Sequence, residues 1–222
     1  MKKETSVVVE APNKMVLKKF PIPNIEADGM LLRVERVGIC GSDPGFYQGK
    51  RKINVYPLIL GHEVVGYVDK IGEKASKRYN VNKGDRVTVE PYIPCGHCKY
   101  CLTGYYQLCK ERRCYGVNLS CNTPPYLWGA YGEYMFVTCG SRVHKISEKV
   151  PAEAACLSSV IGNGVRWVTT KGRVSLGETV VIMGPGAQGL ASTIIAKESG
   201  AGCIILLGTA TDSTRFVLGK RF

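Results

Sequence analysis

The sequence predicts two domains: an all-β, barrel-like unit, followed by the first part of an α/β unit with parallel strands. Before residue 150, short apolar runs separated by glycine and proline recur without helical periodicity, which is typical of a small β-barrel. After residue 150, an apolar run, a glycine-rich turn, a helical segment and a second apolar run follow in order, as in a β-α-β unit. We therefore expect domains over residues 1–150 and 151–222.

Several short strands are expected in the first domain. Residues 30–37 (MLLRVERV) alternate between apolar and polar side chains, as a half-buried strand does. Further β-like runs cover residues 7–9, 58–60, 64–71 and 86–89. Glycines between these runs indicate turns, and strands this short at such spacing favour a barrel-like unit.

The second domain begins with a different pattern. Pro151 stands at an early position of an expected helix, where its missing N–H is tolerated. Residues 178–183 (ETVVIM) are an expected strand, and residues 190–199 (LASTIIAKES) an expected helix that ends at Gly200. Residues 203–207 (CIILL) read as a second buried strand, which completes the β-α-β order.

Composition narrows the class of protein. The chain has 222 residues, of which 45% are apolar, enough for one large domain or two modest ones. No apolar run reaches the roughly 18 residues of a membrane span, and the N-terminal residues lack the apolar core of a signal peptide. We therefore expect a cytoplasmic protein with no membrane partner. The formal charge of +12 suggests nucleic-acid binding as one possible function. The Lys and Arg residues are scattered along the chain, however, so we expect no nucleic-acid partner.

Four of the ten cysteines stand in the spacing C-x2-C-x2-C-x7-C, at Cys95, Cys98, Cys101 and Cys109. Without an export signal, metal binding explains them better than disulfides do. Four thiolates can enclose one tetrahedral zinc and leave no open position, which predicts a structural metal site. An iron–sulfur cluster, whose x3-C-P continuation is absent, and free thiols are the alternatives. His97 lies between the ligands and is expected to face solvent.

A second set of candidate ligands lies in the segments GICGSD and GHEVVG. The thiolate of Cys40, the imidazole of His62 and the carboxylate of Glu63 can hold zinc and leave room for water or substrate. Such a zinc polarises an alcohol oxygen and stabilises the alkoxide from which hydride departs. Ser42 could accept the hydroxyl proton, and Asp43 could orient His62. The alternative is that Cys40 belongs to the core and His62 to an ordinary turn.

A glycine-rich turn joins the expected strand to the helix of the second domain. Gly184, Gly186 and Gly189, with Gln188 between them, form G-x-G-x-x-G, the phosphate-binding turn of dinucleotide-binding domains. The glycines allow the backbone to approach a pyrophosphate, which the helix N-terminus stabilises. The alternative is a glycine-rich turn without a nucleotide.

The choice between NAD and NADP depends on the end of the second strand. NAD-selective proteins place Asp or Glu there to bind the ribose 2′-hydroxyl. The corresponding residue here is Gly208, followed by Thr209, and Arg215 in the next helix could add positive charge. The pattern favours NADP over NAD, although Arg215 could equally be a solvated helix residue.

Taken together, these motifs resemble the zinc-containing medium-chain dehydrogenase/reductase family. Residues 61–72 (GHEVVGYVDKIG) fit its signature G-H-E-x2-G-x5-G. The segments GICGSD and GDRVTVEP, the cysteine motif and residues 128–137 (WGAYGEYMFV) occur in the family's order. The resemblance covers essentially the whole chain. It implies a GroES-like β-barrel catalytic domain, a partial Rossmann domain with a parallel, doubly wound sheet, two zinc ions per chain, NADP or NAD, and a homo-oligomer, either a dimer or a tetramer.

The resemblance also implies an activity: reversible hydride transfer between a small-molecule alcohol, primary, secondary or polyol, and NAD(P), giving an aldehyde or ketone. The family supplies a further Cys, Glu or Asp ligand near the start of its second domain. The matching stretch here, residues 155–162 (ACLSSVIG), has no such residue where it would be expected, and Cys156 lies earlier. Glu63 is therefore expected to bind the metal directly, with water completing the shell.

The chain ends at Phe222, inside the helix expected after the second strand, so we expect a truncated relative. The main alternative to an active enzyme is a catalytically inactive relative that acts as a zinc- and nucleotide-binding or interaction protein. A zinc-free enone or quinone reductase is disfavoured because Cys40 and His62 are both present. A zinc-ribbon nucleic-acid binder is disfavoured by the G-H-E and glycine-turn motifs.

Overall fold

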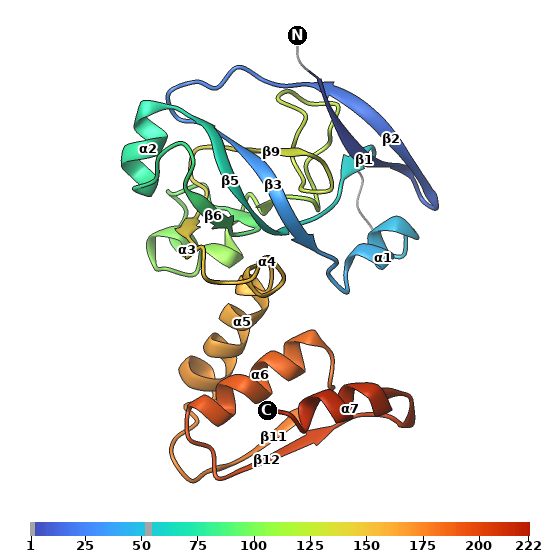
Figure 1. Ribbon diagram of the computed structural model, residues 1–222, viewed down its shortest axis with the longest axis vertical. Helices are drawn as coiled ribbons and strands as arrows, with labels where there is room; N and C mark the ends of the chain where they lie inside the picture. Colours follow the sequence, from blue (N-terminus) through green and yellow to red (C-terminus); the bar gives the residue numbers. More distant parts are fainter. Residues whose placement is uncertain (1–2, 52–54) are drawn as a thin grey trace. The chain divides into compact units, whose positions relative to one another are not determined.

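The computed structural model describes residues 3–51 and 55–222. They divide into two compact units, Met1–Cys156 and Leu157–Phe222 (Figure 1). Among the described residues, no helix is both long and apolar enough to cross a membrane.

The first unit is built mainly from β-strands. Its strands are β1 (Lys3–Ala11), β2 (Lys14–Pro21), β3 (Met30–Gly38), β4 (Leu58–Ile59), β5 (Glu63–Ile71), β6 (Arg86–Val89), β7 (Tyr92–Ile93), β8 (Arg113–Cys114), β9 (Tyr134–Val137) and β10 (Val143–Lys145). Its helices are short: α1 (Asp43–Tyr47), α2 (Glu73–Tyr79), α3 (Lys99–Leu102), the 3-10 turn η1 (Tyr106–Leu108) and α4 (Ala152–Ala155).

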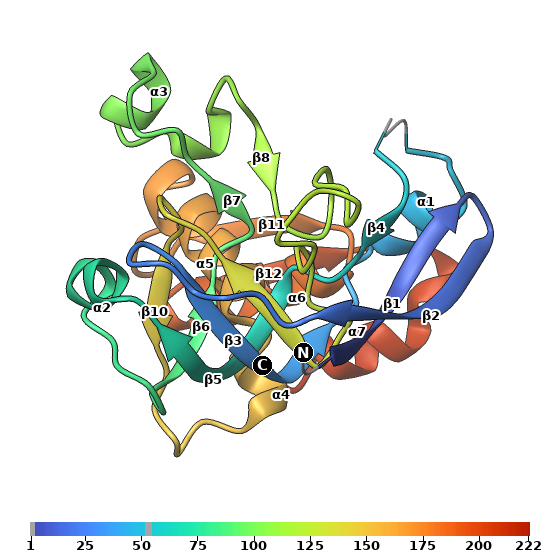
Figure 2. The ribbon, with the colours of Figure 1, turned by 90° about the horizontal axis from the view of Figure 1, so that it is seen from above.

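Two antiparallel sheets form the body of this unit. The larger has the order β10-β6-β5-β3-β9, and the smaller has the order β2-β1-β4 (Figure 2). The alternating strand expected over residues 30–37 is β3, which pairs with β5 in the centre of the larger sheet. A Cβ on Gly66 of β5 would lie 2.3 Å from the carbonyl oxygen of Arg33, so the two strands approach closely only because residue 66 is glycine. The expected all-β unit is confirmed.

The core of the first unit lies against the larger sheet. Strands β3, β5, β6 and β9 contribute its buried aliphatic side chains, and Tyr115 and Trp128 add aromatic rings. These rings stack with their centroids 6.4 Å apart. The core therefore joins strands that are distant in sequence and gives the loops at the strand ends a rigid base.

The end of the first unit differs from the expected domain boundary near residue 150. Arg86 donates hydrogen bonds from Nη1 to the carbonyl oxygens of Ser147 at 3.0 Å and Val150 at 2.7 Å, which ties this segment to β6. Helix α4 follows, and Ala155 and Cys156 are buried against Val65 of β5. The helix that was expected to open the second domain thus packs on the first unit.

The second unit begins a parallel α/β fold. It contains α5 (Ser158–Val165), the π-helix η2 (Arg166–Lys171), β11 (Thr179–Met183), α6 (Ala187–Glu198), β12 (Cys203–Leu207), the 3-10 turn η3 (Ala210–Asp212) and α7 (Ser213–Gly219). Strands β11 and β12 pair in parallel, with Thr179 opposite Cys203 and Met183 opposite Leu207. The predicted β-α-β order is confirmed.

The two faces of the β11–β12 pair differ. On one face, Ile182, Val180 and Leu206 join a core with Ala196 of α6 and Val168 of η2. On the other face, Val181, Met183, Ile205 and Leu207 are exposed, and this set of four side chains is called the open face below. Figure 1 shows α6 lying along the strand pair.

Candidate functional site

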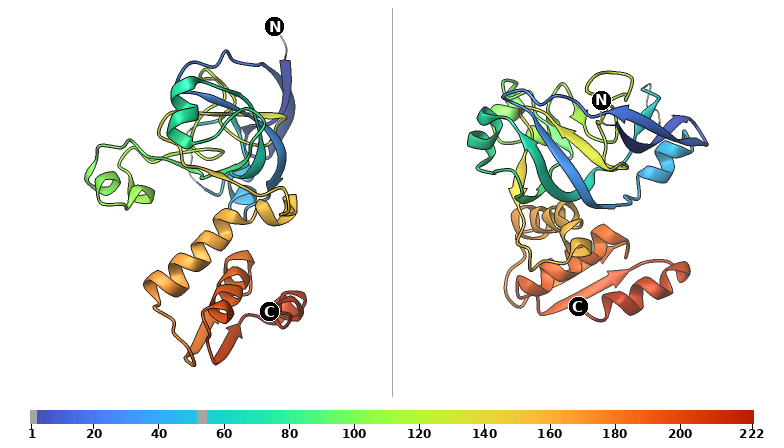
Figure 3. Two further views of the ribbon diagram at one scale, coloured as in Figure 1. Left: turned by 60° about the vertical axis from the view of Figure 1, so that its left-hand side comes forward. Right: turned by 45° about the horizontal axis from the view of Figure 1, so that its top comes forward.

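The four cysteines of the C-x2-C-x2-C-x7-C motif lie in one lobe of the first unit. Cys95 and Cys98 follow β7, Cys101 lies in α3, and Cys109 follows η1. This lobe projects from the sheets (Figure 3). The antiparallel pairing of β7 with β8 closes its base, opposing Ile93 and Arg113.

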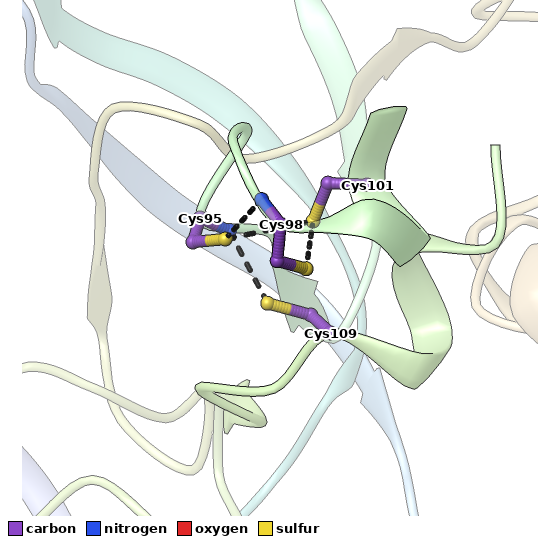
Figure 4. Close-up of side chains that lie close together, drawn as sticks. All are labelled: Cys95, Cys98, Cys101 and Cys109. Atoms are coloured by element: carbon purple, nitrogen blue, oxygen red, sulfur yellow. Dashed lines mark hydrogen bonds between the residues drawn. The ribbon is translucent and has the colours of Figure 1, made fainter. Parts of the chain in front are cut away.

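The geometry of the four sulfur atoms fits one zinc ion. All four lie within 4.8 Å of one another and point inward (Figure 4). The Sγ atoms of Cys95 and Cys101 are 3.8 Å apart, and those of Cys98 and Cys101 are 3.6 Å apart. Four ligands at the usual Zn–S distance of about 2.3 Å form a tetrahedron with edges of about 3.8 Å. The sulfur positions therefore match a closed, tetrahedral site.

The backbone around the lobe favours thiolates. The Cys95 N–H donates to Cys109 Sγ, and the Cys98 N–H to Cys95 Sγ, each at 3.4 Å. Hydrogen bonds from the backbone of Lys110 and Cys101 lower the pKa of Cys98 to about 6. Burial raises the pKa of Cys101 to about 12, so a bound cation is what would make all four sulfurs thiolates together.

His97 lies beside the lobe but outside the sulfur cluster. Its side chain is 78% exposed, and its Nε2 is 3.9 Å from Glu111 Oε1. The solvent-facing position expected from the sequence is what the structure has. A fourth thiolate from Cys109 leaves this imidazole no role in the tetrahedron.

A separate contact holds the lobe to the larger sheet. Tyr106 of η1 donates to Glu90 Oε2 at 2.7 Å, and Glu90 Oε1 is 2.9 Å from His144 Nε2 in β10. The guanidinium of Arg142 lies 5.3 Å from the Tyr106 ring centroid. Glu90 thus links the lobe to β10 of the larger sheet.

Cys40, His62 and Glu63 form a second cluster, whose ligand atoms lie within 4.8 Å of one another. Cys40 follows the end of β3, and His62 and Glu63 stand at the start of β5. Because β3 and β5 are antiparallel, with Gly38 opposite Glu63, these two ends meet. A Cβ on Gly38 would lie 2.7 Å from Glu63 Oε2, so the glycine leaves room for the carboxylate.

The electrostatics of this cluster favour a charged sulfur. Hydrogen bonding with His62 lowers the pKa of the Cys40 thiol against the effect of burial, and Ser42 contributes in the same direction. Burial disfavours the imidazolium of His62, but Cys40 and Asp43 outweigh it and raise the pKa of this histidine. A thiolate, an imidazole and a buried carboxylate are a suitable donor set for zinc.

Asp43, expected to orient His62, is buried beside it. Its Oδ2 accepts a hydrogen bond from the Cys40 N–H at 2.8 Å and another from the Tyr131 hydroxyl at 2.8 Å. Its Oδ1 is 3.8 Å from His62 Nδ1, too long for a hydrogen bond. Ser42, the expected proton acceptor, is half-buried at the start of α1.

Tyr131 has no place among the residues predicted from the sequence. It lies within the WGAYGEYMFV segment, so the family motif covers its position, but no pattern indicates that its hydroxyl reaches Asp43. The two residues are 88 positions apart. Only the folded chain brings them together.

Residues 155–162 supply no counterpart to the further metal ligand that the family resemblance implies. Cys156 is buried against Val65 and Ala155, and burial raises the pKa of its thiol. It is a core residue. The next residues, Ser158, Ser159 and Val160, include no thiol, imidazole or carboxylate.

The glycine turn of the second unit has the geometry that its sequence predicts. Gly184 has a φ of +94°, which favours glycine, and a Cβ on Gly189 would lie 1.8 Å from the Gly184 carbonyl oxygen. Nothing lies within 4 Å of a Cβ placed on Gly186. Gln188 is at the first turn of α6, and its buried Oε1 has no hydrogen-bond partner. The turn is tight, and the space beside its middle glycine is free of other protein atoms.

The residues expected to choose the cofactor lie after β12. Thr209 donates its N–H and its hydroxyl to Asp212 Oδ2, at 3.0 and 2.8 Å, and Arg215 Nη1 donates to Asp212 Oδ1 at 2.9 Å. Asp212 was not among the predicted residues. A carboxylate is therefore present near the strand end, but Arg215 and Thr209 both bind it.

Comparisons with known proteins show which family the chain resembles. The alcohol dehydrogenase GroES-like domain family matches residues 26–148. The probable alcohol dehydrogenase of Mycobacterium tuberculosis is 34% identical over 221 residues, 98% of this chain and 60% of that protein. The D-arabitol-phosphate dehydrogenase of Enterococcus avium is 33% identical over 210 residues, 94% of this chain and 56% of that protein. The chain thus spans less than two thirds of the length of these relatives.

Solved structures give the same result. An alcohol dehydrogenase from Thermotoga maritima matches with a TM-score of 0.87 at 28% identity, over 99% of this chain and 61% of that one. A zinc-binding dehydrogenase from Sinorhizobium meliloti, solved with NADP bound, matches with a TM-score of 0.85 at 26% identity, over 100% of this chain and 60% of that one. The chain belongs to the zinc-containing medium-chain dehydrogenase/reductase family, and its first unit carries the GroES-like domain of the alcohol dehydrogenases.

Proposed function

We propose that this chain is the metal- and cofactor-binding part of an oxidoreductase that interconverts an alcohol with its aldehyde or ketone by hydride exchange with NAD(P). The observation that carries the proposal is the convergence of Cys40, His62 and Glu63, whose ligand atoms lie within 4.8 Å. Three protein donors leave a tetrahedral zinc one open position, which is how catalytic zinc sites accept water or substrate.

Each residue around this position has a part in the proposed reaction. Cys40, His62 and Glu63 would hold the zinc, whose chemistry is to polarise the alcohol oxygen and lower the pKa of the hydroxyl. Ser42 would take the hydroxyl proton and pass it outward. Asp43 would keep a proton on His62 Nδ1, which leaves the Nε2 lone pair for the metal.

A second zinc is proposed for the four-cysteine lobe, with a structural role. Cys95, Cys98, Cys101 and Cys109 would bind it, and the Sγ separations of 3.6 and 3.8 Å support this. Because four protein ligands complete the tetrahedron, this metal would have no position for a substrate.

The second unit is proposed to bind the pyrophosphate of NAD(P) at Gly184, Gly186, Gln188 and Gly189, where the amides at the N-terminus of α6 are available. NADP is the favoured cofactor because Gly208 and Thr209 carry no charge to repel a 2′-phosphate. Arg215 forms a hydrogen-bonded ion pair with Asp212, which neutralises that carboxylate, and Arg215 would also lie near the 2′-phosphate. The Sinorhizobium meliloti relative, solved with NADP, supports this choice.

The proposed substrate is a small polar alcohol of the polyol class. Support comes from the relative in Enterococcus avium, which is named for a polyol phosphate. A homo-oligomer, either dimer or tetramer, and a cytoplasmic location remain predictions, which sedimentation and cell fractionation would test.

The first test is the zinc content of the purified chain by elemental analysis. We expect two zinc ions per chain, falling to one in Cys40→Ala, because that substitution removes a ligand of only one site. A wild-type ratio of one that Cys40→Ala does not change would contradict the proposal.

A second candidate function is zinc and nucleotide binding without turnover. The burial of Cys156 against Val65 and Ala155 favours it, because this thiol is then not available as the further metal ligand that the family resemblance implies. NADPH binding without NADPH formation from any polyol would support this candidate over the first.

A further inference from the structure

We infer that Tyr131 is a positioning residue of the proposed catalytic metal centre and acts through Asp43; this inference rests on the proposed function. The Tyr131 hydroxyl donates to Asp43 Oδ2 at 2.8 Å. The backbone of Tyr131 is held on both sides, since its N–H donates to the Leu60 carbonyl at 2.9 Å and its carbonyl accepts from the Val7 N–H at 2.7 Å. The hydroxyl is therefore anchored to the segment that leads into His62.

The surroundings of Asp43 show what this anchor does. Only 4% of the Asp43 side chain is exposed, and Oδ2 accepts hydrogen bonds from both the Cys40 N–H and the Tyr131 hydroxyl. Oδ1 is then turned toward His62 Nδ1, 3.8 Å away. Among the side-chain atoms that the structure describes, Oδ1 and Nδ1 are both buried and have no hydrogen-bond partner.

An unpartnered buried acceptor beside an unpartnered buried ring nitrogen defines the tautomer of His62. A proton on Nδ1 finds its nearest acceptor in Asp43 Oδ1, a small inward shift completes the hydrogen bond, and Nε2 keeps its lone pair for the metal. Two donors from separate segments fix the carboxylate plane, whereas the Cys40 N–H alone would leave it free to rotate. Tyr131 thus sets the direction in which Asp43 presents Oδ1.

The competing explanation is that Tyr131 only fills space. Its ring packs with Leu60 and Val9, and a Cβ on Gly61 would lie 2.5 Å from Tyr131 Cδ1. Phenylalanine would fill the same space without the hydroxyl. Tyr131→Phe therefore separates positioning from packing.

Tyr56 provides the matched control. Its ring packs in the same cluster, and its hydroxyl donates to the Phe46 carbonyl at 2.6 Å, so Tyr56→Phe also removes a hydrogen-bonded hydroxyl. No hydrogen bond joins the Tyr56 hydroxyl to Asp43. Each variant loses one hydroxyl, but only one of them touches the carboxylate beside His62.

The experiment titrates the zinc-loaded chain with a chromophoric chelator and records the affinity of each zinc. In Tyr131→Phe we expect the zinc at Cys40 and His62 to bind about tenfold more weakly, the scale seen for outer-shell partners of metal ligands. The lobe zinc should keep its affinity. In Tyr56→Phe both affinities should stay within about twofold of wild type. When Asp43 is already replaced by Asn, the further substitution Tyr131→Phe should weaken zinc binding at Cys40 and His62 by less than about twofold.

Three results would overturn the inference. Unchanged affinity in Tyr131→Phe would make Tyr131 a packing residue. A full tenfold loss on top of Asp43→Asn would mean that it does not act through the carboxylate. A wild-type chain that binds zinc only at the lobe would overturn the proposed function and this inference with it. The wild-type titration is therefore done before any variant is made.

Discussion

Glu10 of β1 forms ion pairs with two lysines of the neighbouring strand β2. Its carboxylate oxygens lie 2.8 Å from Lys14 Nζ and 2.6 Å from Lys18 Nζ, and these hydrogen bonds lower its pKa to about 2. A carboxyl group whose folded-state pKa is depressed stabilises the fold above its unfolded pKa of about 4.5, and this contribution disappears as pH falls toward 2.

Glu10→Gln should therefore lower the Tm of the first unit above pH 5, and this effect should become small as the pH falls to about 2. The size will be small, since exposed ion pairs contribute little. Thermal unfolding of wild type and variant from pH 2 to pH 6 measures the difference. A Tm difference that stays constant over this range would rule out the ion pairs as its cause.

Cys109 and Cys114 offer a matched pair of buried thiols. Cys109 belongs to the sulfur cluster, whereas Cys114 donates to the Tyr115 carbonyl at 3.7 Å and lies outside it. Cys109→Ser should reduce the zinc content by one ion per chain, and Cys114→Ser should leave it unchanged. Elemental analysis of the two variants gives the answer, and equal zinc contents would contradict the assignment of the lobe ligands.

At the scale of elements, the glycine turn before α6 makes opposite demands on two of its residues. A Cβ on Gly189 would clash with the Gly184 carbonyl at 1.8 Å, whereas a Cβ on Gly186 would meet nothing within 4 Å. Gly189→Ala should destabilise the second unit by about 1–3 kcal/mol, the usual cost of overpacking. Gly186→Ala should leave stability within about 0.5 kcal/mol but weaken NADPH binding about tenfold or more, because its methyl group would occupy the space proposed for the pyrophosphate.

Denaturant unfolding and NADPH fluorescence titration measure these two effects. If Gly186→Ala bound NADPH as tightly as wild type, the pyrophosphate would not lie against this turn. If Gly189→Ala kept full stability, the turn in solution would be wider than the structure has it.

The elements that could be predicted from sequence are those with a clear local signal. Strands β3 and β5 are β-like runs bounded by glycines, and the β11-α6-β12 order has its own glycine turn. Helices α1, α2 and α3 could not be predicted, because they have 5, 7 and 4 residues and are too short for a helical period to be visible.

The candidate sites divide in the same way. The cysteine lobe and the glycine turn are local in sequence, so their spacing alone identifies them. The roles of Tyr131 and Asp212 could not be predicted from local spacing. Tyr131 contacts Asp43, a residue 88 positions away in the sequence. Asp212 lies beyond the strand-end position where an acidic residue is expected. The bonds from Arg86 to Ser147 and Val150, more than 60 positions downstream, could likewise not be predicted from sequence.

At the scale of the whole molecule, the two units have separate cores. Calorimetry should therefore resolve two unfolding transitions. A zinc chelator should lower only the first unit's transition, and NADPH at about 100 times its Kd should stabilise only the second, by about 2.7 kcal/mol. A single transition that responds equally to both would show that the units unfold together.

The open face is an exposed apolar surface of the β11–β12 pair. Val181, Met183, Ile205 and Leu207 are between 42% and 84% exposed, and contiguous apolar surface favours association. The chain should therefore self-associate with increasing concentration, and Met183→Lys should weaken this without loss of the fold. Analytical ultracentrifugation checks it, with Leu17→Lys, an equally apolar exposed residue of β2, as the control.

The pairing of Gly38 with Glu63 has a consequence for the order in which the metals can enter. The lobe ligands stand within residues 95–109 and can gather around zinc while the rest of the chain is still unfolded. Cys40 and His62 meet only after β3 and β5 have paired in register, so this cluster forms only once these two strands are in place. If both proposed zinc ions bind, the ion of the lobe could be taken up early during synthesis, and the ion at Cys40 and His62 would arrive last.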